Sequence, residues 1–118
     1  MSVELADLIG IPYKPHGRNE TGLDCFGLIR IIARRRGTPI PDVWYEKSDP
    51  ALMILAKSMK VHALSRVEKD CVIEMEEKGR LHLGYAIDEK RMIHVTIRDG
   101  VCVDEIGILP VRGYYGFD

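Results

Sequence analysis

Apolar residues recur with a helical period in only one strong segment of this chain, residues 25–36. One face of that segment is apolar at positions i, i+3, i+4 and i+7, and it consists of Cys25, Leu28, Ile29 and Ile32. Asp24 is a suitable N-cap, and Gly37 followed by Pro39 is a typical helix stop. The pattern therefore predicts a helix over residues 25–36. Weaker patterns predict helices over residues 3–8 and 50–59.

After residue 60 the period changes to two, which indicates β-strands. We expect strands at residues 61–67, 71–76, 81–87, 91–97, 101–106 and 112–117. Helices first and an antiparallel sheet afterwards indicate an α+β fold. A length of 118 residues favours one domain over residues 1–118.

The strand at residues 81–87 separates two kinds of side chain. Its odd-numbered residues are apolar and should face the core, whereas His82 shares the other face with the small residues Gly84 and Ala86. The small residues leave space on this face for another group to lie against the strand. A three-residue turn at 88–90 would pair Gly84 with His94 and bring His82 one diagonal step from His94 on the same face. A loop with an even number of residues would instead place the two histidines on opposite faces.

Charge and composition exclude several classes of protein. The formal net charge is −1 and neither half is strongly basic, so no nucleic-acid partner is expected. The one basic run, Arg34 to Arg36, falls in the last turn of the predicted helix, where it complements the helix dipole. No apolar stretch approaches the roughly 18 residues of a membrane span. The first residues do not resemble a secretory signal, so we expect synthesis in the cytoplasm and export by another route.

Three cysteines without close pairing do not suggest a disulfide framework. Cys71 and Cys102 lie among apolar residues and are expected to be small buried side chains. Cys25 begins the predicted helix, where the dipole stabilises a thiolate and free N–H groups can hold an oxyanion. Cys25 is therefore a candidate nucleophile, although the first apolar residue of a buried helix face would look the same.

A nucleophilic cysteine needs a base, and the paired strands offer one. His82 is the candidate general base, and His94 the residue that fixes its orientation and tautomer. His16 and His62 lie in polar surroundings and are interpreted as incidental. Two histidines on strands could also be ordinary satisfied residues. A zinc site made of Cys25 and both histidines has no evident fourth ligand, so no metal and no cofactor is predicted.

Two stretches of the chain resemble the NlpC-type cell-wall cysteine peptidases. Residues 10–13 (Gly-Ile-Pro-Tyr), Gly17 and residues 22–28 (Gly-Leu-Asp-Cys-Phe-Gly-Leu) are similar to the N-terminal signature of that family. Residues 82–85 and 92–95 are similar to its two histidine strands. The resemblance covers most of the chain, roughly residues 8–117.

The resemblance implies a papain-like fold in which the cysteine helix packs on an antiparallel sheet. It also implies that Cys25 is the nucleophile, His82 the base and His94 the orienting residue, with the Tyr13 hydroxyl near the nucleophile. Asp24 matches an acidic residue that helps to bind the free amino end of a peptidoglycan stem peptide. The implied reaction is metal-free hydrolysis of an amide, typically between γ-D-glutamyl and meso-diaminopimelyl residues.

Phe26 stands where most cell-wall members have serine, and it should line or border the substrate cleft. Together with the Gly-Tyr-Tyr-Gly segment at residues 113–116, Phe26 resembles the bacteriophage tail-assembly branch of the family. That branch implies other phage tail proteins as partners and action from the virion tail at the cell wall. Two alternatives stay open, namely a catalytically silent binding module on the same fold and an amidase or acyl-transfer enzyme.

Overall fold

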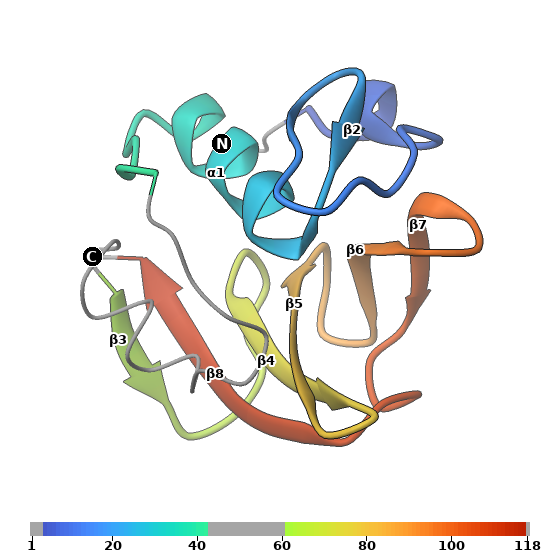
Figure 1. Ribbon diagram of the computed structural model, residues 1–118. Helices are drawn as coiled ribbons and strands as arrows, with labels where there is room; N and C mark the ends of the chain where they lie inside the picture. The colour runs from blue at the N-terminus through green and yellow to red at the C-terminus, as the bar shows by residue number, and fades with distance from the viewer. Residues whose placement is uncertain (1–3, 43–60, 118) are drawn as a thin grey trace.

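One helix lies against a curved, six-stranded antiparallel sheet in the computed structural model, which describes residues 4–42 and 61–117 (Figure 1). Before the helix come a short 3₁₀ turn and a two-stranded ribbon. The elements in chain order are η1 (Ala6–Leu8), β1 (Arg18–Asn19), β2 (Gly22–Leu23), α1 (Cys25–Arg35), β3 (Val61–Leu64), β4 (Val72–Glu77), β5 (Arg80–Ala86), β6 (Arg91–Thr96), β7 (Gly100–Glu105) and β8 (Val111–Phe117).

The order of strands in the sheet is β3-β8-β4-β5-β6-β7, and every neighbouring pair is antiparallel. The last strand of the chain thus inserts between β3 and β4, whereas β4 to β7 follow one another as a meander. The α+β prediction and all six strand positions agree with this sheet. The first strand is shorter than predicted, because it pairs with β8 only over Val61–Leu64.

The helix predictions had a mixed outcome. The main helix ends within one residue of its prediction. The helix predicted over residues 3–8 is wrong for the described residues 4–8, where only the 3₁₀ turn Ala6–Leu8 forms. Gly10, with a φ of +92°, then turns the chain so that its N–H donates to the Val101 carbonyl of β7. The helix predicted over residues 50–59 lies outside the described residues.

Both faces of the central strands are buried, by two different sets of side chains. The larger core lies between α1 and the sheet and includes Leu28, Ile32, Leu83, Tyr85 and Ile93. The smaller core covers the opposite face and consists of Cys71, Ile73, Met75, Ala86 and Met92.

The smaller core corrects the expectation of free space beside Gly84. A Cβ at Gly84 would lie 3.0 Å from the Met75 methyl carbon and 3.2 Å from the Met92 sulfur. Two flexible methionines therefore fill the room that the small residues leave.

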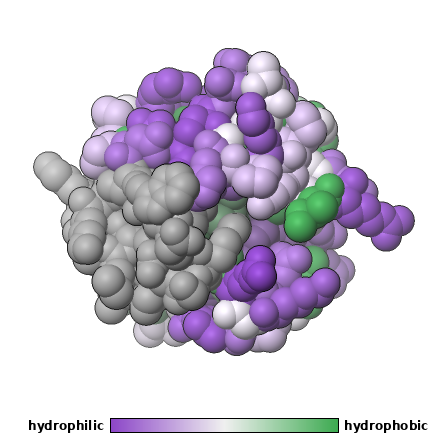
Figure 2. Space-filling view, in the orientation of Figure 1, coloured by the Kyte–Doolittle hydropathy of each residue, from purple (hydrophilic) through white to green (hydrophobic). Residues whose placement is uncertain are grey.

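The basic run lies at the end of α1, as predicted, and two of its arginines also make contacts within the fold. Arg35 donates to both carboxylate oxygens of Asp7 at 2.7 Å. Arg36 donates to the Tyr85 hydroxyl at 3.0 Å, and its guanidinium lies over the Phe117 ring. The described residues on the face in Figure 2 are mostly hydrophilic, with a few separate apolar side chains. Within the described ranges, no helix is both long and apolar enough to span a bilayer.

Candidate active site

Cys25 is the first residue of α1, and its position is fixed by a helix cap and a close backbone contact. The Asp24 side chain accepts a hydrogen bond from the Gly27 N–H at 2.7 Å, so Asp24 is the predicted N-cap. A Cβ at Gly27 would clash with the Gly17 carbonyl oxygen. Only glycine allows the turn at Gly17 to pack this closely on the first turn of the helix.

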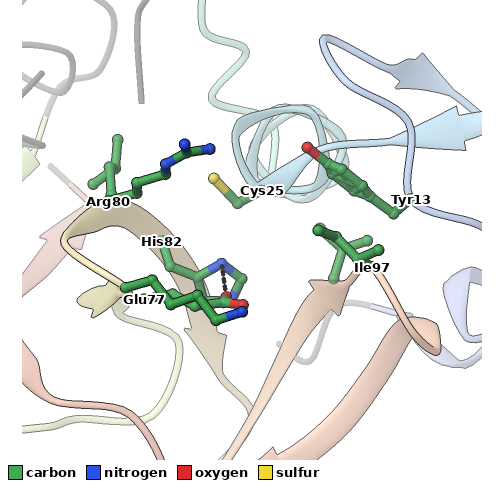
Figure 3. Close-up of a pocket in the computed structure, with 9 residues that line it drawn as sticks. Tyr13, Cys25, Glu77, Arg80, His82 and Ile97 are labelled. Atoms are coloured by element: carbon green, nitrogen blue, oxygen red, sulfur yellow. Dashed lines mark ion pairs between the residues drawn. The ribbon is translucent and has the colours of Figure 1, made fainter. Parts of the chain in front are cut away.

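Tyr13 is held beside the nucleophile candidate by the segment that leads into α1. It forms a parallel bridge with Leu23, two residues before Cys25. On either side of Tyr13, the Leu23 N–H donates to the Pro12 carbonyl and the Lys14 N–H to the Leu23 carbonyl, both at 3.0 Å. In Figure 3 the hydroxyl end of Tyr13 points toward the start of the helix, near Cys25.

The two histidines meet as the hairpin register predicted. Gly84 pairs with His94 across β5 and β6, and the Ile87 N–H donates to the Arg91 carbonyl at the turn. The Nε2 of His82 lies 2.8 Å from the Nδ1 of His94, and the rings meet edge to face at 76°. Both histidines are buried, with 4% and 1% of their surface exposed.

A cavity opens where β5 and β6 separate. The pairing of these strands covers only Gly84–Ala86 and Met92–His94, so the residues of β5 before Gly84 and those after His94 diverge. The cavity has a volume of about 400 Å³. Its wall includes Tyr13, Cys25, His82, Glu77, Lys78, Arg80, Leu81, Val95 and Ile97 (Figure 3).

The structure thus brings Cys25, His82 and Tyr13 to one cavity, with His94 directly behind His82. His16 and His62 do not line it. The Nδ1 of His82 lies on the cavity side, 3.7 Å from the carboxylate of Glu77, which also lines the cavity. A thiol and an imidazole that line one cavity are the two groups that thiol-dependent acyl transfer requires.

Two carboxylates next to the histidines were missed in the sequence. Glu77 ends β4 and approaches His82, whereas Asp104 of β7 lies with its Oδ2 2.7 Å from the Nε2 of His94. The signal for Asp104 was the β6–β7 register: Cys102 pairs with His94, and Asp104 follows two residues later on the same face. Glu77 had no comparable signal, since the position of a strand end depends on the curvature of the sheet.

The other two thiols are poor nucleophiles. Burial raises the pKa of Cys71, and burial followed by the Asp104 carboxylate raises that of Cys102. Cys71 is fully buried, as predicted. Cys102 is only partly buried, which corrects the expectation, and its sulfur lies 3.6 Å from the Oδ2 of Asp104.

Among the described residues, one group has the composition of a metal site. The ligand atoms of His94, Cys102 and Asp104 lie within 4.8 Å of one another. The 2.7 Å between His94 Nε2 and Asp104 Oδ2 is a hydrogen-bond distance. Two ligands of one tetrahedral zinc would be about 3.3 Å apart. We therefore interpret this group as hydrogen-bonded.

The predicted cleft position of Phe26 is wrong. Its side chain is fully buried in the main core, and the Arg18 guanidinium lies 5.2 Å above the ring. The helix directs Phe26 away from the cavity, although it is the next residue after Cys25.

Asp24 is also turned inward. Its Oδ1 accepts from the Gly27 N–H and from Arg18, both at 2.7 Å, and the side chain is 2% exposed. The structure thus gives Asp24 the role of helix cap and anchor for Arg18, and leaves it no surface for direct contact with a substrate.

The architecture is similar to that of a solved structure, the crystal structure of the NlpC/p60 domain of the peptidoglycan hydrolase SagA. The TM-score is 0.69, and the match covers 94% of this chain and 91% of that one. The chain has the NlpC/p60 fold. Identity over the match is 17%, so the likeness concerns the fold. No family model and no curated protein matches the sequence.

Proposed function

We propose that this NlpC/p60-fold chain is a cysteine peptidase that hydrolyses amide bonds in peptidoglycan stem peptides. The observation that carries the proposal is the common cavity of Cys25 and His82, with His94 bonded behind His82. The solved neighbour of the same fold is a peptidoglycan hydrolase, which supports the substrate class.

The positions of these groups support the following course of the proposed reaction. His82 Nδ1 accepts the proton of the Cys25 thiol, and the sulfur keeps the electron pair and attacks the carbonyl carbon. N–H groups at the start of α1 and the Tyr13 hydroxyl can stabilise the oxyanion. The amine leaves with the proton held by His82, and water then hydrolyses the thioester.

The mouth of the cavity suits a substrate with charges of both signs. Glu77 contributes a carboxylate, and Lys78 and Arg80 contribute exposed cations. A stem peptide that contains γ-D-glutamyl and meso-diaminopimelyl residues carries free carboxylates and a free amine. We therefore propose the bond between these two residues as the one that is cut.

The test is digestion of diaminopimelate-type muropeptides, followed by mass spectrometry of the products. The wild type should cleave them, and Cys25→Ala should not. Cys71→Ala is the matched control, because it also removes a buried thiol but lies in the smaller core away from the cavity. Products joined to an added amine would indicate acyl transfer. No cleavage of any muropeptide, with Cys25 unreactive to iodoacetamide, would favour a binding module.

We extend the proposal to a bacteriophage tail, on the resemblance of Phe26 and residues 113–116 to the tail-assembly branch. Mass spectrometry of purified virions and of isolated tails should then detect this chain. Its presence in the host cell but in no virion fraction would overturn this part of the proposal and leave the peptidase activity untouched.

A further inference from the structure

We propose that Asp104 is a positioning residue that fixes the protons on both histidines, so that His82 presents a lone pair to Cys25. For its effect on peptide hydrolysis, this inference rests on the proposed function. The predicted effect of Asp104 on the reactivity of the Cys25 thiol can be tested without any peptide substrate.

A continuous line of hydrogen bonds joins Asp104 to the cavity. The Oδ2 of Asp104 lies 2.7 Å from His94 Nε2, and His94 Nδ1 lies 2.8 Å from His82 Nε2. His94 is 1% exposed, so water cannot readily substitute for either partner. Both ring nitrogens of His94 are therefore committed to the protein.

The direction of each hydrogen bond follows from the first one. An ionised carboxylate only accepts, so His94 Nε2 must carry the hydrogen. The Nδ1 of neutral His94 then has a lone pair, and it accepts from His82 Nε2. This leaves the lone pair of His82 on Nδ1, the nitrogen on the cavity side near Glu77. Asp104 thereby selects the one tautomer of His82 that can accept the Cys25 proton.

The same line of bonds stabilises the charged state. When the S–H bond of Cys25 breaks, its proton goes to His82 Nδ1, and the sulfur keeps the electron pair. The resulting imidazolium donates through Nε2 to His94, which donates in turn to the Asp104 carboxylate. Without that carboxylate, His94 can donate from Nδ1 to His82, which forces the His82 hydrogen onto Nδ1 and leaves Cys25 without a base.

Cys102 supports this arrangement from the side. Its pKa is raised by burial and by Asp104, so the thiol stays protonated and can donate to the same Oδ2 at 3.6 Å. Among the described residues, the other titratable or charged groups that line the cavity beside His82 come from five parts of the fold. They are Tyr13 before β1, Cys25 of α1, Glu77 of β4, Lys78 in the turn between β4 and β5, and Arg80 of β5.

The test compares Asp104→Asn and Asp104→Ala with Glu105→Gln. Glu105 is the next residue of β7 and is exposed, so its variant removes a charge from the same strand without touching either histidine. The Asp104 side chain is itself 41% exposed, which favours folding of both variants, and circular dichroism checks this.

The first readout is the rate of Cys25 alkylation by iodoacetamide as a function of pH, followed at the Cys25 peptide by mass spectrometry. In both Asp104 variants, the rate of Cys25 alkylation near neutral pH should fall by about tenfold or more. The pH profile of that rate should also move to higher pH. Glu105→Gln should match the wild type. The second readout is nitrogen-15 NMR of labelled histidine, in which His82 should carry its hydrogen on Nε2 in the wild type and on Nδ1 in Asp104→Ala.

Unchanged alkylation profiles and an unchanged His82 tautomer in the folded variants would overturn the role of Asp104. If the thiol readouts change as expected but the wild type cleaves no muropeptide, the proposed function is wrong while the role of Asp104 stands. With cleavage present, kcat should fall about 10-fold to 10³-fold with little change in KM, because Asp104 does not line the cavity.

Discussion

The Nε2 of His82 and the Nδ1 of His94 lie 2.8 Å apart, on neighbouring strands whose turn contains three residues. Since only His82 lines the cavity, the two rings occupy unequal positions. In the proposed reaction, His82 exchanges a proton with the thiol and His94 orients His82.

Substitution of the two histidines should therefore give unequal losses. His82→Ala should lower kcat/KM for muropeptides by about 10²–10⁴-fold, because it removes the general base. His94→Ala should lower it less, since His82 keeps its place on the cavity wall. Exposed His62 of β3 is the control, and His62→Ala should cleave like the wild type. Equal losses at His82 and His94 would contradict this division of roles.

Tyr13→Phe tests the oxyanion role of the hydroxyl. We expect kcat to fall by up to about 10²-fold with KM nearly constant, because the hydroxyl would act on charge that develops only in the transition state. Tyr114→Phe on β8 is the matched control, since Tyr114 packs with the smaller core away from the cavity. A rise in KM with constant kcat would instead indicate that Tyr13 binds the substrate in its ground state.

Gly27→Ala tests the contact that fixes the start of α1. The added Cβ would meet the Gly17 carbonyl, and we expect the free energy of unfolding to fall by about 1–3 kcal/mol. Cys25 alkylation should change as well, because the displaced turn lies beside the first turn of the helix. The comparison is Gly37→Ala after the helix, where nothing lies within 4 Å of an added Cβ and only the φ of +84° is strained. Gly37→Ala should lower stability without changing Cys25 reactivity.

Tyr115→Phe tests a buried hydrogen bond between β8 and β4. The Tyr115 hydroxyl donates to Glu74 Oε1 at 2.9 Å, and Glu74 is only 7% exposed. Loss of this donor should lower the free energy of unfolding by about 1–3 kcal/mol in urea denaturation at neutral pH. A variant as stable as the wild type would show that Glu74 does not depend on this bond.

The same pair predicts a pH dependence at the alkaline end. Burial, followed by the hydrogen bond to Glu74, raises the pKa of Tyr115 to about 12. Because the folded-state pKa lies above the unfolded value of about 10, the stabilisation is complete below pH 10 and is lost as the pH rises through about 12. The stability difference between wild type and Tyr115→Phe should shrink over this interval. The tyrosinate absorbance of the folded wild type should likewise show a titration step of Tyr115 near pH 12 that the variant lacks.

Local patterns determined the parts of the protein that depend on neighbours in the chain. The helical spacing and the Asp24 cap located α1. The three-residue turn set the register that places His82 and His94 on the same face of the sheet. Both are decided within about a dozen residues, where the period of the side chains and the geometry of a turn leave few alternatives. The prediction of the N-terminal helix failed for the opposite reason, because Gly10 and its long-range bond to β7 outweigh a weak local preference.

Only the tertiary structure decided what surrounds those elements. Alternation told which residues of β5 share a face, but not that Met75 and Met92 cover the face of Gly84. It did not show that Phe26 enters the core, that β5 and β6 separate into a cavity, or that Asp104 stands behind His94. The burial of Phe26 and the cover of Gly84 depend on packing across the fold, and the cavity depends on where β5 and β6 separate. The place of Asp104 depends on the register of β6 with β7. The sequence by itself determined the place of Cys25 at the start of α1 and the pairing of the two histidine strands. Packing decided the walls of the cavity and the hydrogen bonds behind His82.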